Sequence, residues 1–179
     1  MTIAEQKKNE NICEYILYIW QMEDLLRSVS LDADALFSKF GFEDDEGSEA
    51  EKNWFRNLAK QMKTEKLEKT GHLSEIHTIL TELFLLHDTL IGIIKDKTYL
   101  AAHKNSEGFL KTLMKKASGQ QNPIEHILIA LYGLLILRLQ KKQIHSETEK
   151  AMNSFSQQIA LLSSKYREMK NGELNSSKN

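Results

Sequence analysis

The residues of this chain best suited to chemistry are polar groups at positions where a helical pattern expects apolar ones. Glu23 falls between Ile19 and Leu26 on an apolar stripe. Arg27 follows four residues later, and side chains at that spacing meet on one helix face. A half-buried ion pair is the simpler interpretation of Glu23 and Arg27. A polar ligand site that also uses Trp20 is the alternative.

His87 is the second such residue. It lies at the centre of a stripe that recurs every three or four residues, and the other members are Leu or Ile. The stripe consists of Leu73, Ile76, Leu80, Leu83, His87, Leu90 and Ile94. A lone His at such a position is usually neutral and hydrogen-bonded, so we expect burial to lower its pKa. The alternative is a small-molecule-binding or catalytic pocket built from Glu23, Arg27, His87 and Tyr132.

Metal and cofactor motifs are missing from the sequence. Helical di-iron sites use Glu-x-x-His pairs, and none of the six histidines has Glu three residues before it. Cys13 is the single cysteine, which excludes a zinc site built from several thiolates. There is also no glycine-rich phosphate loop. We therefore predict no metal, no cofactor and no catalytic residue, and favour a non-enzymatic protein while leaving enzymatic activity open.

A helix near residues 124–139 is expected to organise the fold. Asn122 is a candidate N-cap, and Pro123 suits the first helical position. Every residue from Ile127 to Leu137 is apolar, aromatic or Gly, which predicts burial on all sides. This run is shorter than the roughly 20 residues of a membrane span. Gly133 is expected to admit a neighbouring helix closely, so that Gly133→Leu would overpack the contact.

Further helices are expected around this central one. Their approximate ranges are 4–29, 33–40, 49–69, 72–95 and 147–170. The region 96–116 is compatible with one helix or with two short ones. Two capping boxes are predicted, Ser48 with Glu51 and Ser146 with Glu149. The fold class is therefore all-α, a single-domain bundle of six or seven helices around a buried central helix.

Length, charge and cysteine content bear on the number of domains, the partners and the cellular location. The chain has 179 residues, which favours one domain over residues 1–172, with 173–179 as a disordered tail. The net charge of −1 gives no general attraction to nucleic acid or to an anionic membrane, and neither partner is predicted. The lone Cys13 and a charged N-terminal segment without a signal peptide predict a cytoplasmic location.

Two stretches carry a resemblance to a known family. Residues 11–27 read Asn-Ile-Cys-Glu-Tyr-Ile-Leu-Tyr-Ile-Trp-Gln-Met-Glu-Asp-Leu-Leu-Arg, and residues 131–139 read Leu-Tyr-Gly-Leu-Leu-Ile-Leu-Arg-Leu before Ser146-Glu-Thr-Glu. They resemble a bacterial family of about this length, classed only as a domain of unknown function. The resemblance implies a helical domain and assigns no residue a role. The favoured function is a protein-interaction or scaffold domain, with a protein partner or self-association expected.

Overall fold

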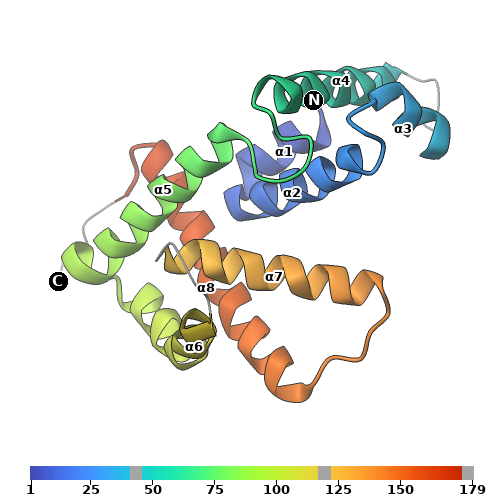
Figure 1. The fold of residues 1–179 in the computed structure, drawn as a ribbon. Coiled ribbons are helices and arrows are strands. Elements are labelled where there is room, and N and C mark those ends of the chain that lie inside the picture. Colours follow the sequence, from blue (N-terminus) through green and yellow to red (C-terminus); the bar gives the residue numbers. More distant parts are fainter. Residues whose placement is uncertain (41–45, 117–121, 175–179) are drawn as a thin grey trace. The chain divides into compact units, whose positions relative to one another are not determined.

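The computed structural model describes residues 1–40, 46–116 and 122–174, and the ordered elements there are all helices (Figure 1). No strand occurs in these ranges, which confirms the predicted all-α fold. In order, the elements are α1 (Ile3–Glu10), α2 (Ile12–Arg27), α3 (Ala33–Phe40), α4 (Glu46–Thr64), α5 (Ser74–Asp88), the π-helix η1 (Thr89–Ile94), α6 (Lys97–Lys116), α7 (Pro123–Leu139) and α8 (Ser146–Lys170).

The helices are divided between two compact units. Unit 1 spans Met1–Ile79 and unit 2 spans Leu80–Asn179, so the boundary between them lies within α5. Each unit has its own buried residues and is described by itself. The single domain expected over residues 1–172 stays a prediction, and most of the expected disordered tail, residues 175–179, lies outside the described residues.

Unit 1 begins with a helix break that the apolar pattern did not predict. The expected helix over residues 4–29 is divided at Asn11, whose φ of −151° and ψ of 99° are extended. The Asn11 side chain accepts a hydrogen bond from the Glu14 backbone N–H and so caps α2. Downstream of the break the predicted stripe is buried, including Ile12, Tyr15, Ile19 and Leu26. The core of unit 1 therefore forms where α2 contacts α1 and α4.

Helix α4 differs from its prediction at both ends. It ends at Thr64 because Lys66 adopts a left-handed conformation and the Leu67 N–H bonds back to the Met62 carbonyl at 2.9 Å. It begins at Glu46, three residues earlier than predicted. The Ser48 side chain of the predicted capping box lies outside the described residues.

Unit 2 contains α6, α7 and α8, which contact one another, together with most of α5. The stripe predicted for α5 is buried from Leu80 through His87 to Leu90. The backbone then winds into η1, which ends where Lys95 adopts a left-handed conformation. The region 96–116 forms the single helix α6, and this outcome decides between the two alternatives left open by the sequence.

Helix α7 begins as predicted, with the Asn122 side chain accepting hydrogen bonds from the N–H groups of Ile124 and Glu125. Its burial is different from the prediction. One face is buried, whereas Ile129 on the opposite face is 54% exposed and Leu139 is 67% exposed. A helix that is apolar on every side is therefore covered on only one of them.

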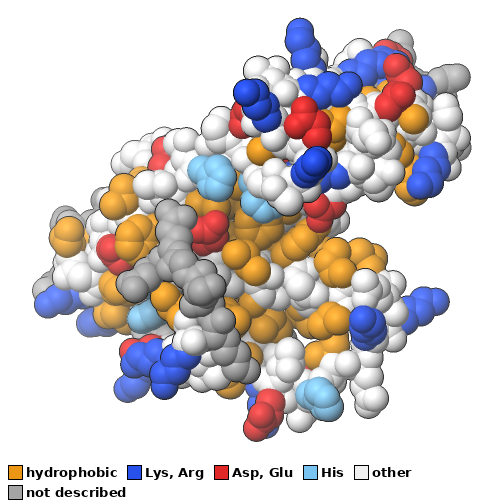
Figure 2. Space-filling model, in the orientation of Figure 1, with side chains coloured by type: hydrophobic (Ala, Val, Ile, Leu, Met, Phe, Trp, Pro, Cys, Tyr) orange, Lys and Arg blue, Asp and Glu red, His pale blue; other side chains and the backbone are white. Residues whose placement is uncertain are grey.

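Twelve of the 17 residues of α7 fall into two sets, and Pro123, Glu125, His126, Leu135 and Arg138 belong to neither. The inner face consists of the buried residues Ile124, Ile127, Leu128, Leu131 and Leu134. The outer face, as named here, consists of the exposed or half-buried residues Ile129, Ala130, Tyr132, Gly133, Ile136, Leu137 and Leu139. Figure 2 shows hydrophobic side chains gathered along α7.

The start of α8 also differs from its prediction. His145 is the N-cap and makes no side-chain capping bond, while Ser146 is already the first helical residue. The Glu149 N–H bonds to the His145 carbonyl at 3.0 Å. The predicted Ser146–Glu149 capping box is therefore wrong, because the helix begins one residue earlier than a Ser146 cap requires.

Gly133 provides the first testable prediction. It is exposed, and a Cβ placed there would meet nothing within 4 Å, so the expected close contact with a neighbouring helix is wrong. Glycine inside a helix is less favourable than alanine, so Gly133→Ala should raise the free energy of unfolding by about 0.5–1 kcal/mol. Urea denaturation at low protein concentration measures this change. A clear loss of stability would show that the position is packed.

Candidate functional site

The first polar cluster lies in unit 1 and is centred on Glu23, whose side chain is completely buried. Its Oε1 accepts a hydrogen bond from the Leu73 backbone N–H at 3.0 Å, and its Oε2 lies 2.5 Å from His72 Nδ1. The His72 ring stacks on Trp20 with a centroid distance of 4.8 Å. Both carboxylate oxygens of Glu23 are thus bonded to the segment that leads into α5.

Arg27 completes this cluster, which we call the Glu23 cluster. Arg27 Nη2 is 3.9 Å from Glu23 Oε2, so the predicted ion pair between these two residues is present but long. Closer bonds go from Arg27 to the carbonyl of Leu67 at 3.1 Å and to that of Gly71. Arg27 therefore holds the connection between α4 and α5 against α2, and Glu23 fastens the same connection one turn away.

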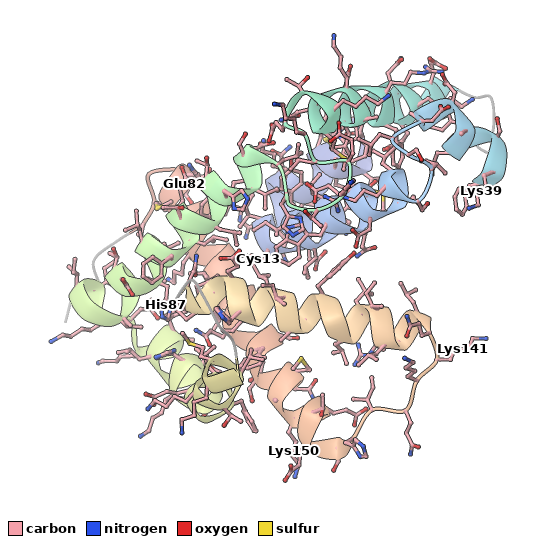
Figure 3. All side chains as sticks on the ribbon, viewed as in Figure 1. Cys13, Lys39, Glu82, His87, Lys141 and Lys150 are labelled. Carbon is pink, nitrogen blue, oxygen red and sulfur yellow. The ribbon has the colours of Figure 1, made fainter. Side chains whose placement is uncertain are left out.

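The second polar cluster, called the His87 cluster, lies in unit 2, where α5 ends (Figure 3). His87 Nδ1 is 2.7 Å from the Tyr99 hydroxyl, which also accepts a hydrogen bond from Gln158 Nε2 at 3.3 Å. The His103 ring lies 5.0 Å from the His87 ring, centroid to centroid. The Ser106 hydroxyl is within hydrogen-bond distance of Gln158 Oε1. Residues from α6 and α8 thus surround the end of α5.

Burial and neighbouring charge determine the protonation of His87. Its Nδ1 shares one hydrogen bond with the Tyr99 hydroxyl, and which of the two groups donates depends on the tautomer of the ring. Burial, assisted by the positive charge that His103 would carry, lowers the pKa of His87 to about 4. Burial also lowers the pKa of His103. His87 is therefore neutral at ordinary pH, which confirms the predicted direction of its pKa shift.

The four residues proposed for one pocket fall in both units. Glu23 and Arg27 belong to unit 1, whereas His87 and Tyr132 belong to unit 2. Glu23 has His72 and Leu73 as partners, and His87 has Tyr99. Tyr132 is half-buried on α7. A shared pocket of all four residues stays a prediction.

Sequence reasoning did not find the partners of these residues. His72 is 49 positions from Glu23, and Gln158 is 59 positions from Tyr99. Helical periodicity identifies residues on one face of one helix, and it does not match residues between distant helices. The sequence did show polar side chains on apolar stripes. This pattern identified Glu23 and His87 but not the residues that they contact.

In the described part of the chain, no three His, Cys, Asp or Glu side chains lie close enough together to bind one metal ion.

Among the same described residues, one helical segment, Ser74–Ile94, is long and apolar enough to cross a membrane. In the structure 39% of its most apolar 18-residue stretch is buried. One such helix is weak support for a membrane span, because core helices pass the same test. The expected absence of a membrane partner stays a prediction.

An apolar groove with a volume of about 450 Å³ runs between α7 and α8 in unit 2. Its α7 wall includes Ala130, Gly133 and Leu137 from the outer face. Thr148 and Met152 of α8 form the other side, and Thr148 is the one polar residue among those that line it. The groove therefore offers apolar contact and almost no hydrogen-bonding chemistry.

The fold and these features define an all-α domain whose buried polar clusters are bonded internally and whose open groove is apolar. A family model described as a domain of unknown function (DUF4924) matches residues 1–173, and the chain belongs to that family. The resemblance found in residues 11–27 and 131–139 is thereby confirmed. No curated protein and no solved structure matches the chain significantly.

Proposed function

We propose that this protein is a non-enzymatic helical interaction domain that associates with a second copy of itself through the outer face of α7. The observation that carries the proposal is the exposure of that face, with Ile129 at 54% and Leu139 at 67%. Contiguous apolar surface of this kind on a folded protein usually marks an interface. The apolar groove beside it extends the same surface onto α8.

Charge favours a second copy as the occupant. The seven residues of the outer face are uncharged, and its nearest charges on α7 are Glu125, one turn before Ile129, and Arg138, next to Leu139. The whole chain has a net charge of −1, so two copies repel one another little. In a two-fold symmetric dimer the same patch meets itself, which suits a patch that is apolar throughout. Gly133 at its centre would let the two α7 backbones approach each other closely, because nothing of its own chain fills the space above it.

The alternative, a ligand pocket near Glu23, Arg27 and His87, has less support. A binding pocket keeps polar groups available to its ligand, whereas these three side chains are bonded to groups of their own unit. The lone, buried Cys13 also suits a reducing cytoplasmic setting, where no disulfide is needed. We therefore place interaction, and not catalysis, first.

Sedimentation velocity over a wide range of protein concentration tests the proposal. The natural chain should form a dimer, and Ile129→Glu should remain a monomer at concentrations where the natural chain is dimeric, because a buried unpaired carboxylate opposes association. Leu85→Glu is the matched control, since Leu85 is 58% exposed on α5 and lies outside the outer face. A monomeric natural chain, or equal effects of both substitutions, would overturn the proposal.

A further inference from the structure

A second groove lies in unit 1, between α4 and the segment that runs from the end of α2 into α3. It is open and has a volume of about 920 Å³, near the upper end of the range for ligand sites. Leu31, Ala33 and Ala59 give it a buried apolar floor. We call it the α3–α4 groove. It is unrelated to the outer face of α7 and does not depend on the proposed dimer.

Basic residues line one side of this groove. Arg56, Lys60 and Lys63 recur on α4 at spacings of four and three, so they form one stripe about 10 Å long. Lys39 adds a fourth positive charge from the end of α3 (Figure 3). Figure 2 shows basic side chains over α4. Unit 1 has more acidic than basic residues in total, so this concentration of positive charge is a local exception.

The acidic residues of the groove are already engaged. Asp32 Oδ1 accepts hydrogen bonds from the N–H groups of Asp34 and Ala35 at the start of α3. Asp34 pairs with Arg56 at 3.0 Å. By contrast, Lys39, Lys60 and Lys63 are exposed and form no ion pair within the described residues. In the part of the chain that the structure describes, three ammonium groups thus carry no ion pair above an apolar floor, and that of Lys39 lies 5.6 Å from the centroid of the Phe40 ring.

We propose that the α3–α4 groove binds an acidic, amphipathic peptide segment of a partner protein. Apolar side chains of the segment would contact the floor, and its carboxylates would meet the lysines along the rim. The form of the groove favours a peptide over a small phosphorylated molecule, because a small ligand is usually enclosed on most of its surface. The one guanidinium that could grip a phosphate with two parallel bonds, that of Arg56, is held by Asp34 and Glu49.

Fluorescence anisotropy of the full chain with a short labelled peptide tests the proposal. In the probe peptide Glu and Leu recur at helical spacing, and in the reference peptide every Glu is replaced by Gln. The acidic peptide should bind, more weakly as salt is raised, and the reference peptide should not. Reversing two charges in Lys60→Glu/Lys63→Glu should weaken binding by about tenfold or more, because carboxylates would then face carboxylates.

Lys97→Glu/Lys104→Glu is the matched control, with two exposed lysines of α6 in unit 2 reversed and the same change in net charge. It should bind the acidic peptide as the natural chain does. Circular dichroism confirms that both variants fold. The proposal is overturned if the acidic peptide does not bind, if the reference peptide binds equally, or if both variants lose affinity alike. It is also overturned if inorganic triphosphate, added at the same ionic strength, displaces the peptide at equal concentration.

Discussion

Glu23→Ala should lower the free energy of unfolding by about 3–5 kcal/mol, the usual cost of removing one partner from a buried charged cluster. The substitution leaves the Leu73 N–H without its acceptor and His72 without its carboxylate. It also removes the buried carboxylate that lies 3.9 Å from Arg27, which keeps its exposed pair with Asp24 at 2.8 Å. Urea denaturation followed by circular dichroism measures the change, and the connection between α4 and α5 should become more sensitive to proteolysis.

Glu14→Ala on the same helix is the control for this prediction. Glu14 forms an exposed ion pair with Lys7 at 3.3 Å, and such pairs contribute less than about 1 kcal/mol. If the two substitutions cost the same, Glu23 does not fasten the connection. Glu23→Gln should lie between them, because the amide oxygen can still accept from the Leu73 N–H while the charge is lost.

The largest pH effect should come from His87. Its pKa is about 4 in the folded chain and 6.5 in the unfolded chain, so the unfolded chain takes up the proton first as the pH falls. The contribution of His87 to stability is therefore complete above pH 6.5 and is lost between 6.5 and 4. A shift of this size corresponds to about 3 kcal/mol at pH 4. Denaturant midpoints measured across that range should decline as the pH is lowered.

His87→Gln separates this effect from the titration of other groups. Glutamine does not titrate and keeps a hydrogen-bonding group for the Tyr99 hydroxyl, whereas leucine would leave that hydroxyl without this partner. The stability difference between the natural chain and the variant should shrink as the pH falls from 6.5 to 4. A difference that stays constant, or an NMR titration that places the His87 pKa above 6.5, would contradict the neutral, buried assignment.

The sequence was sufficient for the fold class and for the neutrality of His87, because both follow from local periodicity. It missed the break at Asn11, since a polar residue inside a polar run gives no sign that its side chain will cap a new helix. It also missed the partners of Glu23 and His87, which come from other helices. The assignment of two units depends on contacts between distant residues, which no pattern within a single helix records.

The burial of α7 shows a different limit. The sequence alone does not distinguish an apolar residue that packs in the core from one, such as Ile129, that is exposed to a partner. Periodicity showed that every side of α7 is apolar, and burial on every side was inferred from that. In the structure Ile124 and Leu128 are buried, while Ile129 and Gly133 are exposed. The sequence thus identified the helix and missed the face that the proposed function uses.

Disulfide cross-linking through α7 tests the proposed self-association most directly. Gly133→Cys places a thiol at the centre of the outer face without a clash, because a Cβ there meets nothing within 4 Å. Cys13 is buried and will not compete in the folded chain. Under mild oxidation Gly133→Cys should become a covalent dimer, whereas Leu85→Cys, also exposed but on α5, should stay monomeric. A Gly133→Cys chain that remains monomeric while Leu85→Cys cross-links, or two variants that behave alike, would contradict association through α7.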